Sequence, residues 1–201
     1  MDKILVKKTI QGYDDFADEM AKKFDAIGPR VKEINKVFKL IEKKNPSVLE
    51  LGCANGRDAQ EILLHTSDYI GIDGSEKLVK IARKRLPKAK FRVAFFDEIK
   101  FPPQSFDAVL DFASLFHYDK DSLRNILRNI AKWLSGEGVL LMSIKKGEYQ
   151  KTVSATGFGE RTQFLYKPQD IIALAEDYEV VDIEEQNLHS QDWFTIILKK
   201  K

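Results

Sequence analysis

The stretch "VLELGCANGRDA", Val48 to Ala59, decides the fold because a short buried strand passes there into a glycine loop. Four mostly apolar residues lead to Gly52, and Gly56 follows just before a charged pair. Glycine lets the backbone turn tightly and approach a ligand without a Cβ in the way. In an open parallel sheet, ligands bind beyond the carboxyl ends of the strands, where this loop would lie. The stretch therefore predicts an α/β sheet with a ligand site at its edge.

Strand and helix patterns alternate after this loop. Apolar runs of strand length are followed by segments with apolar residues at helical spacing. Ser75 is expected to cap one of these helices, which should stop near Pro87. The strands expected after the first are YIGID, FRVAFF, FDAVLDF and GVLLMSI. This alternation predicts βαβ units and a largely parallel, doubly wound sheet.

The two ends of the chain differ from this alternating middle. Two amphipathic helices are expected first, one from Tyr13 to Phe24 and one from Val31 to Ile41. Residues 145–163 are rich in Gly, Ser, Thr and Lys and are expected to form a long loop, which is usually functional or mobile. A short helix should begin at Pro168. The segments YEVVDIEEQ and WFTIILKK then fit an antiparallel pair that closes the sheet.

Length and composition favour one globular domain. The chain has 201 residues, of which 43% are hydrophobic and 32% charged, and this argues against disorder. We expect a helical cap at 1–45, a ligand-binding core at 46–144, and a cap loop with closing strands at 145–201. A net charge of only +2 disfavours nucleic-acid binding. With one cysteine, no signal-peptide pattern and no membrane-spanning apolar run, the sequence predicts a cytoplasmic protein.

Two acidic residues follow the glycine loop at regular intervals. Asp73 ends the second strand, where a carboxylate can accept both hydroxyls of a ribose. Asp97 is expected to end the third strand, after Phe96, where an adenine would reach. The G-x-G-x-x-G pattern of dinucleotide binding would need glycine where the chain has Ala54 and Arg57. The loop and the acids therefore favour an adenosyl ligand over a dinucleotide.

The sequence resembles the class I S-adenosylmethionine-dependent methyltransferases, whose glycine loop reads E/D-x-G-x-G-x-G. Glu50, Gly52 and Gly56 match this pattern, and Ala54 departs from it. Further segments are similar to the family in the same order: YDDFADEMA, FPPQSFDAVLDFASLFHYD, LSGEGVLLMSIKKGE and GERTQFLYKPQDI, the last typical of a small-molecule branch. The resemblance implies a Rossmann-like sheet of seven strands with the last one antiparallel.

The resemblance also implies which residues hold the cofactor, S-adenosylmethionine. They are Tyr13, Glu50, Gly52, Cys53, Ala54, Gly56, Asp73, Gly74, Phe96, Asp97 and Ala113. Asp73 would bind the ribose and Asp97 the adenine, while Glu50 would either brace the loop amides or reach the methionine ammonium. For Ala54 we expect a negative φ, with its methyl group beside the cofactor.

The acceptor side carries weaker signals. His117 follows the fourth strand and is expected to face the methyl group of the cofactor. A neutral imidazole there could take a proton from the acceptor. The alternative for His117 is a capping or packing role without proton transfer. Arg161 and Tyr166 are candidates for the acceptor pocket, and their alternative is a surface position. Cys53 has no base in a motif and is expected to be inert. No metal site is predicted, because histidine and cysteine lack ligand spacing.

Together these residues predict an enzyme that transfers a methyl group to an O, N or S nucleophile of a small molecule by in-line displacement. Three alternatives stay open. The protein could methylate RNA or another protein, or bind S-adenosylmethionine without catalysis, given Ala54. A nicotinamide dehydrogenase is the third alternative, and the missing glycines disfavour it.

Overall fold

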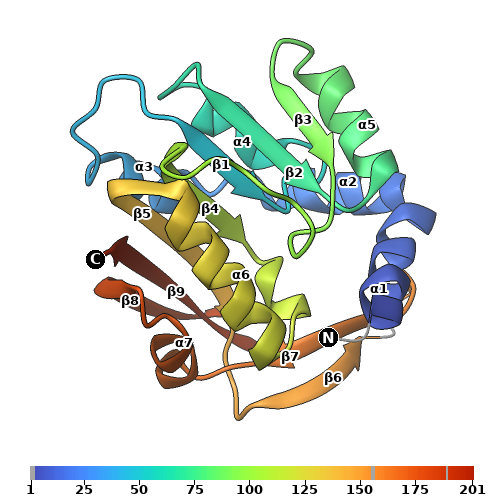
Figure 1. The fold of residues 1–201 in the computed structure, drawn as a ribbon. Helices are drawn as coiled ribbons and strands as arrows, with labels where there is room; N and C mark the ends of the chain where they lie inside the picture. The colour runs from blue at the N-terminus through green and yellow to red at the C-terminus, as the bar shows by residue number, and fades with distance from the viewer. Residues whose placement is uncertain (1–2, 155–156, 189) are drawn as a thin grey trace.

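The computed structural model describes residues 3–154, 157–188 and 190–201, and its centre is a seven-stranded sheet (Figure 1). The strands are β1 (Val48–Leu51), β2 (Tyr69–Asp73), β3 (Lys90–Val93), β4 (Phe106–Phe112), β5 (Leu134–Lys145), β8 (Tyr178–Leu188) and β9 (Gln191–Lys200). Their order across the sheet is β3-β2-β1-β4-β5-β9-β8. Strands β1 to β5 run parallel, and β9 is antiparallel to both β5 and β8. The predicted doubly wound, mostly parallel sheet with an antiparallel last strand is confirmed.

Helices cover both faces of the sheet, because its central strands are buried on both sides. One face is covered by α3 (Val31–Phe38), α4 (Arg57–Ile62) and α5 (Glu76–Arg85), and the other by α6 (Lys120–Trp133) and α7 (Pro168–Leu174). Successive residues of a strand point to opposite faces, so Val48 packs with the first group and Leu49 with the second. None of the described helices is long and apolar enough to cross a membrane.

Two helices begin where their sequence signals placed them. The amide of Leu78 donates to the Ser75 hydroxyl at 3.2 Å, which caps α5. Pro168 opens α7, where its missing N–H and fixed φ suit the first helical position. Both predictions rested on local capping chemistry, and both are confirmed.

The N-terminal region has three helices where two were predicted. They are α1 (Lys3–Asp15), α2 (Ala17–Ile27) and α3. The expected first helix is divided at Phe16, whose φ of −117° and ψ of 32° are not helical, and α1 before it was not predicted. Gly28, at φ 77°, ends α2 close to the predicted position.

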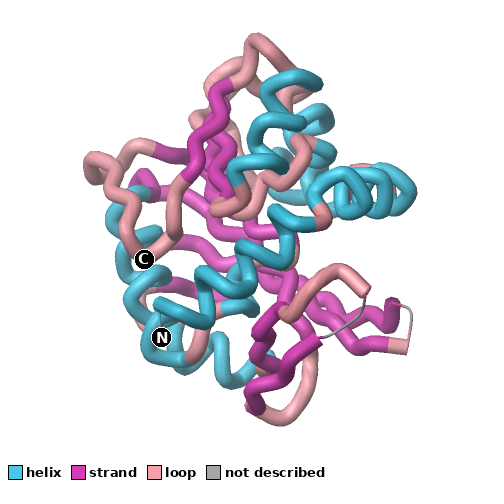
Figure 2. The backbone as a smooth tube through the Cα atoms, turned by 90° about the vertical axis from the view of Figure 1, so that its right-hand side faces the viewer, coloured by secondary structure: helices cyan, strands magenta, loops and turns pink. Residues whose placement is uncertain are grey.

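The predicted long loop at 145–163 is wrong, because a β-hairpin occupies much of it. Strands β6 (Gln150–Ser154) and β7 (Arg161–Leu165) pair antiparallel as a separate small sheet. Strand β7 also contacts α1 and the 3₁₀ turn Leu115–His117, and α1 lies beside the hairpin in both views (Figure 1, Figure 2). This tertiary support comes from segments far away in the sequence, so polar residues form strands without an alternating apolar pattern.

Strand β3 is shorter than expected, and this moves Asp97 out of the sheet. The predicted strand ran to Phe96, but β3 ends at Val93. Among the described strands it pairs with β2 alone, and the last pair joins Val93 to Asp73, where β2 itself ends. Asp97 therefore lies in an exposed turn beyond the strand.

Candidate functional site

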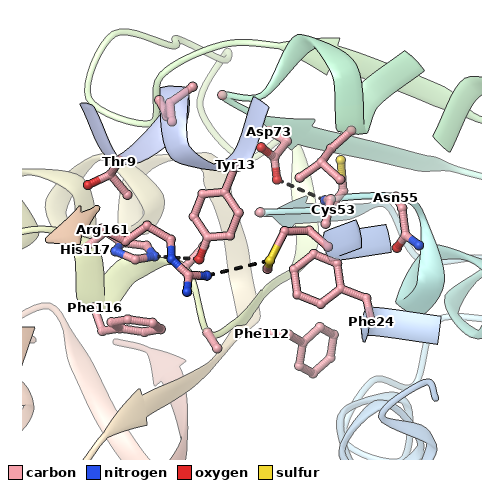
Figure 3. Close-up of a pocket in the computed structure, with 18 of the residues that line it drawn as sticks. Thr9, Tyr13, Phe24, Cys53, Asn55, Asp73, Phe112, Phe116, His117 and Arg161 are labelled. Atoms are coloured by element: carbon pink, nitrogen blue, oxygen red, sulfur yellow. Dashed lines mark hydrogen bonds between the residues drawn. The ribbon is translucent and has the colours of Figure 1, made fainter. Parts of the chain in front are cut away.

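A cavity of about 510 Å³ lies at the carboxyl ends of β1, β2 and β4 (Figure 3). Its volume falls in the range of small-molecule sites. It brings together most of the residues predicted for the site: Tyr13, Gly52, Cys53, Ala54, Asp73, Gly74, Phe96, Ala113, His117 and Arg161. These come from the glycine loop, from the ends of three strands, and from α1 and β7, so the cavity is built by the whole fold.

The glycine loop has left-handed backbone angles at three places. Gly52 and Gly56 have φ of 76° and 77°, and Ala54 has φ of 46°. The prediction of a negative φ for Ala54 was therefore wrong. The physical reason is a hydrogen bond: the Ala54 amide must point at Asp73, and it donates to Oδ2 at 2.9 Å. This bond helps to hold an alanine in a conformation that costs roughly 1–2 kcal/mol.

Asp73 is fixed from two sides at the end of β2. Its Oδ2 accepts the Ala54 amide and its Oδ1 accepts the Ser75 amide at 2.8 Å. Burial raises the pKa of Asp73 to about 6, against the opposing effect of these amides. Each carboxylate oxygen can accept more than one hydrogen bond, so the group can still accept from ligand hydroxyls.

Glu50 and Gly56 lie outside the cavity. The Glu50 side chain is fully buried, and its Oε2 accepts a hydrogen bond from the Tyr69 hydroxyl. Burial raises the pKa of Glu50 to about 8. Gly56 begins α4, and a Cβ there would lie 3.3 Å from Cβ of Ala82. Among the described residues, Glu50 therefore bonds Tyr69 and not the loop amides, in contrast to the bracing role expected for it, and Gly56 packs against α5.

Asp97 and Tyr166 are also absent from the cavity wall. The exposed turn that holds Asp97 adjoins Phe96, which does line the cavity. Tyr166 is fully buried, and its hydroxyl donates to the carbonyl oxygen of Tyr118 at 2.5 Å. Neither of its expected positions, in the acceptor pocket or on the surface, matches this structure: Tyr166 joins β7 to the core.

His117 is neutral and has partners on both ring nitrogens. Its Nδ1 faces the carbonyl oxygen of Thr162, which only accepts, so Nδ1 carries the proton. Nε2 then accepts from the Tyr13 hydroxyl, 3.1 Å away (Figure 3). Burial lowers the pKa of His117 to about 4. The lone pair that could take a proton points at Tyr13.

A second group of cavity residues, around Arg161, was not predicted from the sequence. Lys145 ends β5, its ammonium lies 5.5 Å from the ring centroids of both Phe116 and Trp193, and it donates to Oε1 of Gln163 at 2.5 Å. Trp193 packs partly buried against the core and also lines the cavity. The position of Lys145 at the carboxyl end of a parallel strand was the signal that could have identified it.

A third group, also missed, lies at the other end of the cavity. Asp58 accepts from the backbone amide of Arg30 at 2.8 Å and from its Nη1 at 3.2 Å, and it pairs with Arg57 as well. Asn55 donates from Nδ2 to the Asp25 carboxylate at 2.9 Å. Its Oδ1 is buried without a hydrogen-bond partner among the described residues. Such an atom needs a donor.

Comparison with known families identifies the central part of the chain. Residues 48–138 match a family described as a methyltransferase domain. The chain is 33% identical over 96 residues to a probable S-adenosylmethionine-dependent methyltransferase of Mycobacterium tuberculosis, covering 48% of this chain and 34% of that protein. It is 31% identical over 135 residues to demethylmenaquinone methyltransferase of Thermotoga maritima, covering 62% and 58%. The chain thus spans less than two thirds of the length of either relative.

Solved structures share the fold over nearly the whole chain. A Burkholderia thailandensis 1,6-didemethyltoxoflavin-N1-methyltransferase, solved with 1,6-didemethyltoxoflavin and S-adenosylhomocysteine, has a TM-score of 0.71 and 15% identity and covers 96% of this chain and 88% of its own. A putative S-adenosylmethionine-dependent methyltransferase from Listeria monocytogenes has a TM-score of 0.71 and 16% identity, covering 84% and 98%. At these identities the likeness concerns the fold alone.

Proposed function

Residues 48–138 match a methyltransferase-domain family, and we propose that the chain is a class I S-adenosylmethionine-dependent methyltransferase that methylates an O, N or S nucleophile of a small molecule. The observation that carries the proposal is the Asp73 carboxylate, fixed by the Ala54 and Ser75 amides at the wall of the cavity. S-adenosylmethionine, when bound, supplies a methyl group on a sulfonium, which is strongly electrophilic.

The residues of the cavity fit this cofactor. Asp73 can accept the ribose hydroxyls, and Phe96 and Gly74 line the same part of the wall. The buried Oδ1 of Asn55 requires a hydrogen-bond donor, and the ammonium of the methionine moiety would supply one. Asp97, in the turn next to Phe96, stays our proposal for the adenine.

The chain's main task in the reaction would be orientation. Displacement at a sulfonium methyl releases a neutral thioether, so no acid is needed for the leaving group. Positioning an acceptor in line with the methyl group can contribute up to ~7–11 kcal/mol. The aromatic walls at Tyr13, Phe116 and Trp193 and the polar groups of β7 would hold the acceptor.

His117 is our proposal for the group that receives the acceptor's proton. Because burial lowers its pKa to about 4, it is a weak base. Such a base takes a proton late, once methylation has made the acceptor's own proton strongly acidic. The Tyr13 hydroxyl occupies Nε2 in this structure, so the acceptor would replace it there or pass the proton through it.

Two other functions are retained as alternatives. A cofactor-binding module without catalysis is favoured by one observation, the engagement of the His117 lone pair by Tyr13. Methylation of RNA or protein is the other alternative, and the chain's small net charge of +2 disfavours RNA.

Calorimetric titration followed by methyl transfer tests the proposal. We expect micromolar or tighter binding of S-adenosylmethionine and S-adenosylhomocysteine, and none of NAD. Labelled methyl groups should then move to members of a metabolite panel and not to tRNA or protein pools. Binding of NAD alone would refute the cofactor, label in a macromolecular pool would favour the second alternative, and binding without transfer to any pool would favour the module.

A further inference from the structure

The described cavity wall has a local excess of positive charge. Its basic residues are Lys23, Arg30, Arg57, Lys145 and Arg161, and its carboxylates are Asp58 and Asp73. This is an excess of three charges in a chain whose total net charge is only +2. Asp58 is already paired with two of the arginines. One carboxylate offsets only one of these two arginines, so one excess charge stays at that end of the cavity and the other two lie around Lys145.

Lys145 has cations and a neutral amide around it. Its ammonium donates to Gln163, lies over the Phe116 and Trp193 rings, and forms no ion pair with any described carboxylate. Burial lowers the pKa of Lys145, and the charges of Arg161 and Lys23 lower it further. An ammonium has three N–H donors, so two remain after the bond to Gln163. A half-buried cation in such a place needs an anion.

Arg161 and His117 lie close to the same point. The Arg161 guanidinium is buried, 5.2 Å from the Tyr13 ring centroid, and it lines the cavity beside His117 (Figure 3). The charges of Arg161 and Lys145 both contribute to the low pKa of His117. The proposed base and the cations therefore share one subsite.

We propose that the methyl acceptor is an organic anion, and that Lys145 and Arg161 bind its acidic group beside His117. The inference rests on the proposed function, because it identifies the acceptor of the same reaction. Guanidinium and ammonium groups together suit a carboxylate or a phosphate, and the Phe116 and Trp193 rings suit an apolar or aromatic body. A sulfonium cofactor would add positive charge to the cavity, which strengthens the demand for an anionic acceptor.

Fluorescence quenching tests the anion site without knowledge of the acceptor. Trp193 is partly exposed in the cavity, whereas Trp133 is buried, so ionic quenchers report mainly on Trp193. Relative to free tryptophan, the ratio of the iodide to the caesium quenching constant should be about tenfold higher, and this increase is the iodide preference. Lys145→Gln should remove most of this preference. Lys146→Gln is the matched control, because Lys146 pairs with Glu185 and does not line the cavity; it should keep the preference.

Paired acceptors then test the chemistry. A panel should contain each aromatic acid beside its neutral amide, and each phosphate monoester beside its alcohol, with methyl transfer as the readout. We expect acids to exceed their neutral partners by about tenfold or more in kcat/KM, and this preference to fall in Lys145→Gln but not in Lys146→Gln. The more active acid class identifies carboxylate or phosphate.

The outcomes separate this inference from the proposed function. An iodide-to-caesium ratio no higher than that of free tryptophan, a preference that survives Lys145→Gln, or methylation of neutral partners in place of acids would overturn the anionic acceptor while leaving methyl transfer intact. Failure to bind S-adenosylmethionine, with the iodide preference present, would instead overturn the proposed function and the assignment of the anion as methyl acceptor, and would leave only the anion site at Lys145.

Discussion

The amide of Ala54 donates a 2.9 Å hydrogen bond to Oδ2 of Asp73, and this bond joins the glycine loop to the acid at the end of β2. The Ser75 amide holds the other carboxylate oxygen. The two elements that sequence reasoning treated as separate ligand contacts are therefore one unit. Loss of the Asp73 carboxylate should therefore weaken cofactor binding, whereas a change at Ala54 that keeps the backbone amide in place should not.

Asp73→Asn should weaken S-adenosylhomocysteine binding by about 100-fold. The N–H₂ group of asparagine would face one of the two backbone amides, so that two donors would meet. Asparagine also lacks the negative charge that strengthens a hydrogen bond from a ribose hydroxyl, and a charge-assisted hydrogen bond is worth about 1.5–3 kcal/mol. Calorimetry gives the dissociation constant. Asp68→Asn is the control, because Asp68 precedes the amino end of β2 and Asp73 lies at its carboxyl end. An equal loss of affinity in both variants would contradict a direct role of Asp73.

The same residue should make cofactor binding depend on pH. The pKa of Asp73 is raised by burial to about 6, and in our proposal the ionised form would accept both ribose hydroxyls. Affinity should therefore be full above pH 7 and fall as the pH drops through 6, by up to about tenfold per pH unit below the pKa. Calorimetry between pH 7.5 and 5 checks this. Asp73→Asn should show a flatter profile, and parallel profiles would argue against Asp73 as the titrating group.

Ala54→Gly should leave cofactor affinity unchanged within about threefold, because the Ala54 backbone already has the left-handed conformation that glycine adopts. Relief of strain should offset the entropy cost of glycine, so the free energy of unfolding should stay within about 1 kcal/mol or rise. Ala59→Gly inside α4 is the control and should lose ~1 kcal/mol or more. Urea unfolding compares the two. Equal destabilisation would show that Ala54 is not strained.

How much the sequence could predict follows from the range of the interactions involved. Ser75 and Pro168 were read correctly because capping depends on near neighbours. The β6–β7 hairpin was missed because α1 supports it from far along the chain. Lys145 was missed because its unusual electrostatic environment comes from Arg161 and Lys23, which are far away in the sequence and near Lys145 only in the folded chain. The periodicity of apolar residues predicts where helices and strands lie in the sequence. An excess of charge within a cavity becomes visible only when the fold brings the charged residues together.

Ala54 shows the same limit at the scale of one residue. A departure from a glycine motif can mean a changed backbone or a strained one, and sequence alone does not separate these. In the structure, Ala54 has the left-handed backbone conformation typical of glycine, and the alanine is strained by it. This conformation lets the Ala54 amide donate its hydrogen bond to the Asp73 carboxylate. Asp97 was misplaced for a related reason: β3 ends where β2, the strand it pairs with, also ends.

His117 should make the protein sensitive to acid. Its pKa is lowered by burial from 6.5 to about 4, so between these values the unfolded chain binds a proton that the folded chain does not. Its contribution to stability is therefore full above pH 6.5 and declines as the pH falls towards 4, by up to ~3 kcal/mol. In His117→Asn, the asparagine amide can still donate to the Thr162 carbonyl. The stability difference between this variant and the original protein should shift in the variant's favour from pH 7.5 to 4.5, measured by urea unfolding; a constant difference would contradict the assignment.

Gly52→Ala should disrupt the site through contact as well as backbone strain. A Cβ at Gly52 would lie 2.4 Å from Cβ of Ser114, and Gly52 has a φ of 76°. We expect a loss of about 2–4 kcal/mol in the free energy of unfolding. Gly136→Ala is the matched control, because nothing lies within 4 Å of its added Cβ, and it should change stability by less than about 0.5 kcal/mol.

A second variant separates the two causes at Gly52. Ser114→Gly removes the side chain that the new methyl group would strike, so the double variant Gly52→Ala/Ser114→Gly should lose less stability than the sum of the single variants. The positive coupling should approach 1–3 kcal/mol, a range typical of residues in contact, and about 1–2 kcal/mol of backbone strain should remain. Urea unfolding of all four proteins completes the cycle. Simple additivity would mean that the left-handed φ alone excludes alanine, and that the close approach of the glycine loop to Ser114 carries no energetic weight.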